Sequence, residues 1–231
     1  MKISLGTTYY NNPENIISFV EHHQEYVDEL IIVDDGSADI YHILNYVKPS
    51  EKIKLYRVKQ DYGFNSHGCR NLIMKEASNE FVILMDSDRM IVDPKHSIEY
   101  VKKRLLKTDR LYRFVAHVSD IGNSIHESVN DYMISKTHFF SAGGYDEEWI
   151  GYRNGDRHFF EQLKFFGDET VLHEVNIVLL RGPTVRMNDA RLSSANDIKS
   201  PSTENYRIVM QRLKKPEPNK KILTFEWERL S

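Results

Sequence analysis

The chain has 231 residues, of which 40% are hydrophobic and 28% charged, and its formal net charge is −3. This composition is typical of a globular protein with a sizeable core, and the small net charge gives no reason to expect a nucleic acid or a membrane surface as partner. The single cysteine, Cys69, excludes an intrachain disulfide. No apolar run approaches the roughly 20 residues that cross a bilayer, and the first residues lack the apolar stretch of a signal peptide, so we expect a cytoplasmic protein.

The first half of the chain predicts alternating strands and helices. Short apolar runs predict buried strands at residues 3–7, 30–33, 53–58 and 81–85. Helices are expected from Asn12-Pro13, over 66–77 and from Asp93-Pro94, because Asn and Asp cap helices well and Pro suits the first helical position. This order predicts an α/β fold with a mostly parallel central sheet flanked by helices on both sides.

The second half is less regular. Strands are expected at residues 111–118, 132–135 and 170–180, with a turn at Gly143-Gly144 and a helix over 156–166. A long polar loop is expected at 181–202, followed by a helix at 206–213 and a basic, proline-broken segment at 214–221.

Two acidic motifs follow predicted strands. Asp86 and Asp88 end the apolar run that begins at Phe81, and residues two apart in an extended segment point the same way. Two such carboxylates can hold a hard divalent cation, and the carboxyl ends of strands are where open α/β sheets bind ligands. Asp34-Asp35 ends the earlier strand and precedes Gly36-Ser37, where a carboxylate can accept hydrogen bonds from a base or a ribose. Each motif by itself also fits an ordinary exit from a strand into a turn.

Arg70-Asn71 lies near the start of the predicted helix before Phe81. Its arginine can pair with a phosphate or with an acidic loop, although a solvated charge on a helix face is the commoner outcome for such a residue.

Taken in chain order, these pieces resemble the GT-A fold glycosyltransferases of family 2 type over about residues 1–92. The resemblance implies that Asp34 and Asp35 contact the nucleoside of a nucleotide-sugar, and that Asp86 and Asp88 hold its diphosphate through Mn²⁺ or Mg²⁺. Thr7 and Arg70 are further candidate contacts to this donor. One GT-A domain over 1–231 is expected, with a nucleotide-sugar half at 1–92, an acceptor and catalytic half at 93–181, and a mobile loop and tail at 182–231.

A second motif, Gly143-Gly144-Tyr145-Asp146-Glu147, resembles a Gly-Gly-Phe-Asp-Glu segment of the same superfamily, close to the galactosyltransferase C-terminal region. Relatives follow it with a Glu-Asp pair, for which this chain has Gly155-Asp156. The resemblance implies that Asp156 is the general base. A carboxylate there also suits a helix N-terminus, where negative charge is stabilised, so a role as helix cap alone is the alternative.

Relatives often supply a histidine as third metal ligand after the last core strand. Residues 179–182 offer none, and His173, on the strand before them, is the candidate. Arg181 or Arg186 can instead neutralise a diphosphate directly, and Trp149 or Tyr152 can stack on a sugar ring.

The sequence therefore suggests a metal-dependent transferase that moves a sugar, most readily from a UDP-sugar, to a hydroxyl with inversion. The acceptor is open among a glycan, a lipid-linked sugar, a protein and a modified nucleobase. The alternatives are a retaining transferase, a nucleotidyltransferase and a non-catalytic nucleotide- or sugar-binding protein. The glycine- and lysine-rich loop of nucleotidyltransferases is absent from residues 5–10.

Overall fold

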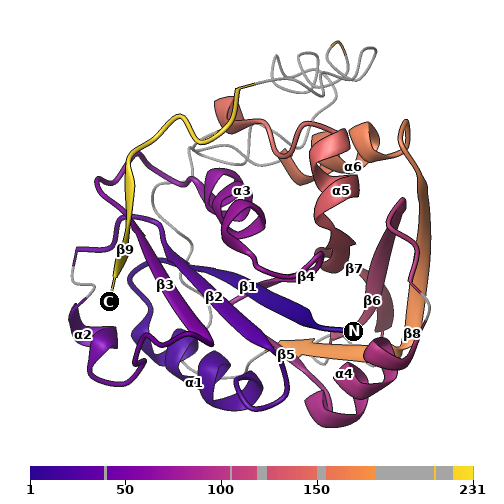
Figure 1. The fold of residues 1–231 in the computed structure, drawn as a ribbon, viewed down its shortest axis with the longest axis horizontal. Coiled ribbons are helices and arrows are strands. Elements are labelled where there is room, and N and C mark those ends of the chain that lie inside the picture. Colours follow the sequence, from indigo (N-terminus) through magenta and orange to yellow (C-terminus); the bar gives the residue numbers. More distant parts are fainter. Residues whose placement is uncertain are drawn as a thin grey trace.

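The computed structural model describes residues 1–38, 41–104, 106–118, 124–149, 155–179, 211 and 221–230. Within these ranges the chain forms a nine-stranded mixed sheet in the order β5-β8-β6-β7-β4-β1-β2-β3-β9 (Figure 1). The strands are β1 Ile3–Tyr9, β2 Glu29–Asp34, β3 Ile53–Val58, β4 Phe81–Asp86, β5 Arg89–Ile91, β6 Arg110–Val118, β7 Ser124–Ser135, β8 Asp168–Leu179 and β9 Trp227–Leu230. The helices are α1 Pro13–His23, α2 Tyr41–Leu44, α3 Ser66–Glu76, α4 Pro94–Lys103, α5 Lys136–Ser141 and α6 Gly155–Leu163, with a 3₁₀ turn at Glu147–Trp149.

Strands β3, β2, β1 and β4 run parallel and are buried on both faces. Along β2, Leu30 and Ile32 belong to a core shared with α1, whereas Ile31 and Val33 belong to a second core shared with α3. This alternation follows from the two-residue period of a strand, and it explains why the run is apolar throughout. The expected α/β sheet with helices on both sides is thus confirmed.

The helix starts follow the capping residues in the sequence. Asn12 accepts a hydrogen bond from the Asn15 N–H at 3.3 Å, and Asp93 accepts one from His96 N–H at 3.1 Å. Both caps are as predicted. Residues Asn65 and Ser135 cap α3 and α5 in the same way.

Beyond β4 the sheet becomes mixed. Strand β7 pairs antiparallel with β4, β6 pairs antiparallel with β7, and β8 pairs parallel with β6 and antiparallel with the short β5. At the opposite edge, β9 pairs antiparallel with β3, a pairing that the sequence did not suggest. The C-terminal strand therefore lies beside the N-terminal half of the protein (Figure 1).

Several sequence predictions lie outside the described residues: the loop at 181–202, most of the helix at 206–213 and nearly all of the segment at 214–221. In the described part of the chain, none of the helices has the length and apolar character needed to traverse a bilayer.

Candidate active site

The carboxyl ends of three parallel strands meet at one edge of the sheet. Thr8, near the end of β1, pairs with Asp86 of β4, and Tyr9 pairs with Asp34 of β2. The chain reaches β2 and β3 on one side of β1 and returns to β4 on the other side, so this edge is a topological switch point. Ligands of open α/β sheets bind in the crevice at such a point.

Asp34 and Asp35 lie at the end of β2 and are both buried. The Asp34 carboxylate accepts the Ser37 N–H at 3.1 and 3.2 Å and lies 3.7 Å from Arg57 Nε. Asp35 Oδ2 accepts the N–H of Asn65 at 2.9 Å. Both aspartates thus shape the end of β2, and Asp35 also ties it to the start of α3.

Gly36 allows the chain to turn here. Its φ is 78°, and a Cβ at this position would lie 2.9 Å from the Asp61 Cα. A side chain would therefore meet both backbone strain and a steric clash.

Asp86 is the last residue of β4, and Asp88 follows in the turn to β5. Their side chains are 32% and 33% exposed, so both carboxylates reach the surface of the site. Burial and the nearby charge of Asp86 raise the pKa of Asp88 to about 6. The two carboxylates thus repel one another, and a cation between them would relieve that repulsion.

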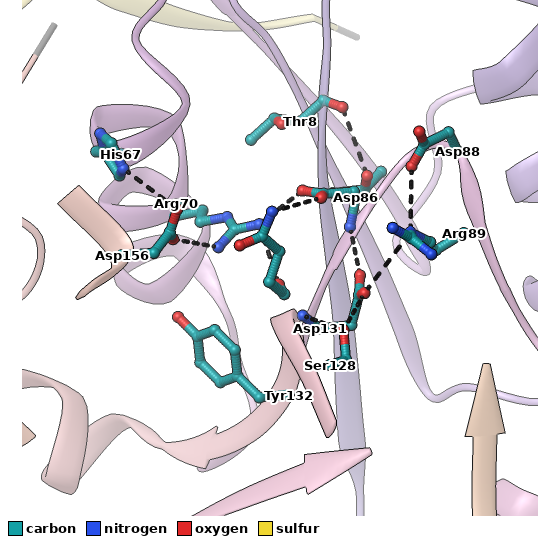
Figure 2. A network of polar contacts seen from close by, with 12 residues as sticks. Thr8, His67, Arg70, Asp86, Asp88, Arg89, Ser128, Asp131, Tyr132 and Asp156 are labelled. Atoms are coloured by element: carbon teal, nitrogen blue, oxygen red, sulfur yellow. Dashed lines mark hydrogen bonds and ion pairs between the residues drawn. The ribbon is translucent and has the colours of Figure 1, made fainter. Parts of the chain in front are cut away.

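A third carboxylate supports this turn from beneath. Asp131 of β7 is 1% exposed, accepts the Asp86 N–H at 2.9 Å through Oδ1 and accepts Ser128 Oγ–H at 2.6 Å through Oδ2 (Figure 2). Burial and the charge of Asp86 raise its pKa to about 7. No feature of the sequence singled out Asp131, because its role depends on the antiparallel pairing of β7 with β4.

Arg70 of α3 stands between the two halves of the site. Its side chain is 4% exposed. Nη2 donates to Asp86 Oδ1 at 2.7 Å and Nη1 donates to Asp156 Oδ1 at 3.0 Å (Figure 2). Arg70 is therefore a buried bridge between two carboxylates rather than a solvated charge on a helix face. Further bonds to the Asn130 carbonyl at 3.1 Å and the Tyr145 hydroxyl at 3.0 Å fix its orientation.

Asp156 is the second residue of α6, so it lies in the first turn of the helix and is not its cap. The expected carboxylate at the helix N-terminus is confirmed, whereas Asp156 does not occupy the N-cap position. Its Oδ1 accepts from Arg70 and from the Tyr145 hydroxyl, each at 3.0 Å, and its Oδ2 lies 3.7 Å from His67 Nε2. Burial works to raise the pKa of Asp156, but the adjacent charge of Arg70 above all outweighs it and holds the pKa well below the usual range.

The Gly-Gly-Tyr-Asp-Glu motif and Arg70-Asn71 interlock. Gly143 and Gly144 turn the chain with φ of 82° and 69°. Asn71 then accepts the Tyr145 N–H at 2.8 Å and donates to the Tyr145 carbonyl at 3.0 Å. A Cβ at Gly144 would lie 2.8 Å from Asn71 Oδ1, so the close approach requires glycine. The two motifs, 74 residues apart, hold the Tyr145 hydroxyl against Asp156.

Glu147 ends this motif and ties it to the C-terminal segment. The carboxylate is buried and accepts four hydrogen bonds, from Asn71 Nδ2 at 2.8 Å, Leu223 N–H at 2.7 Å, Thr224 N–H at 2.9 Å and Thr224 Oγ1–H at 2.8 Å. Its role here is to join three segments, not to face the open part of the site.

The structure does not bring Thr7 or His173 to these groups. Thr7 is 1% exposed inside β1, between Ile32 and Met85 of the neighbouring strands. His173 is exposed on β8. It precedes Leu179, the residue that pairs with Arg89 beside Asp88, by six positions, roughly 20 Å along a strand.

The carboxylates present suit a hard divalent cation. Among the described residues no three His, Cys, Asp or Glu side chains are grouped as a metal site. Mg²⁺ is nevertheless commonly held by one or two carboxylates together with substrate phosphates, and Asp86 and Asp88 offer such a pair. His173 is not needed in this arrangement. Residues 181 and 186 and the side chain of Trp149 lie outside the described part.

The fold has known counterparts among solved structures. Residues 1–349 of TarS from S. aureus, in complex with UDP-GlcNAc, match with a TM-score of 0.65 and 18% identity over 92% of this chain and 65% of that one. GalNAc-T7 with UDP, GalNAc and Mn²⁺ matches with a TM-score of 0.64 and 13% identity over 91% and 48%. The mannosyltransferase PcManGT from Pyrobaculum calidifontis, with GDP-Man and Mn²⁺, matches with a TM-score of 0.59 and 15% identity over 79% and 57%.

The chain thus spans less than two thirds of the length of each of these proteins, and at such low identity the likeness confirms the GT-A fold. A comparison with curated proteins finds no match. The sequence profile of glycosyl transferase family 2 matches residues 4–181, which include all of the carboxylates described above. The chain belongs to glycosyl transferase family 2.

Proposed function

We propose that this protein transfers a sugar from a nucleoside-diphosphate sugar, a UDP-sugar above all, to a hydroxyl group. The observation that carries the proposal is that Arg70 forms ion pairs with both Asp86 and Asp156 at the switch point of the sheet. These contacts support a diphosphate site and a base that share one guanidinium. The UDP and UDP-GlcNAc complexes of TarS, which has the same fold, support UDP as the nucleotide.

In this proposal, Asp35 at the end of β2 contacts the nucleoside, and Asp86 with Asp88 holds a divalent cation. Such a cation, Mn²⁺ or Mg²⁺, neutralises charge on the departing diphosphate when bound. The chain itself supplies the rest. Asp156 Oδ2 is not engaged by Arg70 or Tyr145 and receives the proton of the attacking hydroxyl, and Arg70 fixes the carboxylate through Oδ1.

Calorimetry of UDP binding tests the donor site. With Mn²⁺ present, we expect binding in the wild type and a loss of affinity with chelator or in Asp88→Asn. Asp168→Asn is the matched control, because that exposed residue lies at the far end of β8. Equal affinity with and without Mn²⁺ would refute the metal role. A ligand at about 100 times its dissociation constant should also add roughly 2.7 kcal/mol to stability.

Kinetics of Asp156→Asn test the base. The substitution keeps the shape of the side chain and removes its basicity, so turnover should fall by roughly 10²–10⁴-fold while UDP affinity is kept. Wild-type turnover in Asp156→Asn would contradict the assignment.

One alternative has a specific observation in its favour. The ion pair of Asp156 with Arg70 weakens the carboxylate as a base, which suits a retaining transfer in which no protein carboxylate accepts the proton. The anomeric configuration of the product, measured by NMR, distinguishes retaining transfer from inverting transfer.

A further inference from the structure

His67, a residue that the sequence did not single out, is buried beside Asp156. It is the second residue of α3 and is 2% exposed. Its ring lies 5.1 Å from the Tyr145 ring, at an interplanar angle of 31°, and its Nε2 is 3.7 Å from Asp156 Oδ2 (Figure 2). Among the described residues, neither ring nitrogen has a hydrogen-bond partner. A buried polar group left in this way is destabilising, so its presence calls for an explanation.

Gly155 is what allows the ring to lie there. A Cβ at position 155 would be 2.3 Å from His67 Cε1 and 2.5 Å from Nε2. Any side chain at this position, including the glutamate of the related motif, would collide with the imidazole. The glycine that departs from the related motif and the histidine beside it are thus parts of one arrangement.

The two oxygens of Asp156 have different surroundings. Oδ1 is held by Arg70 and the Tyr145 hydroxyl, whereas Oδ2 faces His67. The gap of 3.7 Å between Nε2 and Oδ2 exceeds a hydrogen bond, so this geometry does not fix Nε2 as a donor to the carboxylate. An acid formed at Oδ2 would be short-lived, because the Arg70 guanidinium favours the carboxylate. An imidazole, as a class, is a better proton acceptor near neutral pH.

We propose that His67 shares the base function with Asp156, an inference that rests on the proposed glycosyl transfer. The bond from the acceptor oxygen to the anomeric carbon forms as the bond from that carbon to the diphosphate breaks, and the diphosphate leaves with the electron pair. The hydroxyl proton passes to Asp156 Oδ2 and then to His67 Nε2, which leaves an imidazolium beside a carboxylate. His67 acts through Asp156 and does not touch the substrate.

The ligand-free protein provides a test that does not depend on turnover. The ¹⁵N shifts of the imidazole ring, assigned by comparison with His67→Gln, report which nitrogen carries the hydrogen. At pH 8 we expect the hydrogen on Nδ1 and none on Nε2. A hydrogen on Nε2 would overturn the relay, whatever the outcome for sugar transfer.

Two variants test the relay in turnover, measured as hydrolysis of UDP-GlcNAc. His67→Gln removes the proton acceptor, and Gly155→Ala keeps the imidazole but forces it away from Asp156. In both we expect a kcat about 10–100-fold lower and an unchanged KM. The charged or titratable groups that face His67 are Asp156 of α6, Tyr145 and, one turn along α3, Arg70.

His138→Gln is the matched control. His138 of α5 is equally buried, and neither of its ring nitrogens has a hydrogen-bond partner among the described residues, but its ring packs beside Gly167, after the end of α6. Its variant should keep the wild-type kcat and KM. If His67→Gln behaves like His138→Gln while Asp156→Asn loses turnover, the relay is wrong and the proposed function stands. If the wild type hydrolyses no UDP-GlcNAc, this sugar is excluded as the donor. The ¹⁵N measurement of the His67 tautomer then tests the relay by itself.

Discussion

At the scale of single residues, the charge balance of the site depends on Arg70. This guanidinium contacts Asp86 and Asp156 directly, while Asp88 and Asp131 lie beyond its reach with raised pKa values. Burial disfavours the charged form of Arg70, but its anionic neighbours hold its pKa above the usual value. Arg70 thus balances Asp86 and Asp156, whereas Asp88 and Asp131 share the longer contacts of Arg89, at 3.7 and 4.0 Å, and a metal ion is expected on that side.

Arg70→Lys tests whether the forked geometry matters as well as the charge. A single ammonium cannot reach both Asp86 and Asp156 in the way that the two terminal nitrogens do, so one carboxylate loses its partner. We expect a loss of about 2–4 kcal/mol in the free energy of unfolding, measured in urea. Arg104→Lys, at an exposed position after α4, should cost far less. Equal stability of the two variants would mean that charge alone suffices.

Asp35→Asn tests the nucleoside contact. Asparagine keeps an oxygen for the Asn65 N–H, so the start of α3 should survive, whereas Asp35→Ala would disturb both roles. We expect the affinities for UDP and for a UDP-sugar to fall together in calorimetry. An unchanged UDP affinity with altered preference among sugars would place Asp35 at the sugar instead.

At the scale of elements, the short strand β5 is held in place by the last turn of α1. His23 Nε2 accepts the Ile91 N–H at 3.2 Å, and His22 Nε2 lies 2.8 Å from the Ile91 carbonyl oxygen. His23 Nδ1 in turn bonds to the Phe19 carbonyl at 2.8 Å, so this ring is neutral with its hydrogen on Nδ1. Because β5 directly follows Asp88, these histidines support the turn that carries the two exposed carboxylates.

This arrangement predicts a dependence of stability on pH. Burial lowers the pKa of His23 to about 3, so the unfolded chain binds the proton more readily than the folded one. The contribution of His23 is fully present above pH 6.5 and is lost as pH falls towards 3, by up to about 1.4 kcal/mol per pH unit.

Urea unfolding of the wild type and His23→Gln between pH 4 and 7 measures this slope. Asp88 and Asp131 act in the opposite sense in the same range, because their pKa values are raised to about 6 and about 7. The difference between the two proteins isolates His23 and should shrink as the pH falls. A constant difference would show that the pKa of His23 is the same in the folded and unfolded states.

At the scale of the whole molecule, Glu147 connects the C-terminal segment to the helix α3 of the site. Its carboxylate receives hydrogen bonds from α3 and from residues 223 and 224, and β9 then extends the sheet beside β3. Phe225 packs into the same core as Cys69 and Leu72 of α3. The C-terminal segment therefore stabilises the helix that carries Arg70.

Glu147→Gln should weaken this connection. An amide replaces one acceptor oxygen by a donor that faces other donors, so at least one hydrogen bond to a charged group is lost and one N–H is left unpaired. We expect a loss of about 2–4 kcal/mol in the free energy of unfolding. Glu148→Gln, on the same 3₁₀ turn with an exposed side chain, should be nearly neutral. Similar melting temperatures for the two variants would contradict this stabilising role of Glu147.

The sequence by itself determined the elements of the first half and the place of Asp86 and Asp88. Apolar runs, capping residues and turn glycines act over a few neighbouring residues, so their pattern is local and predicts β1 to β4 and α1, α3 and α4 closely. Tertiary structure alone decided the partners of Arg70, which lie 16 and 86 positions away, and the support of Asp131 for Asp86 across 45 positions. It likewise placed His67 against Gly155, β9 beside β3 and His173 far from Asp88. Contacts between segments so distant in the chain follow from how helices and strands pack around the sheet, and short-range sequence patterns carry no record of that packing.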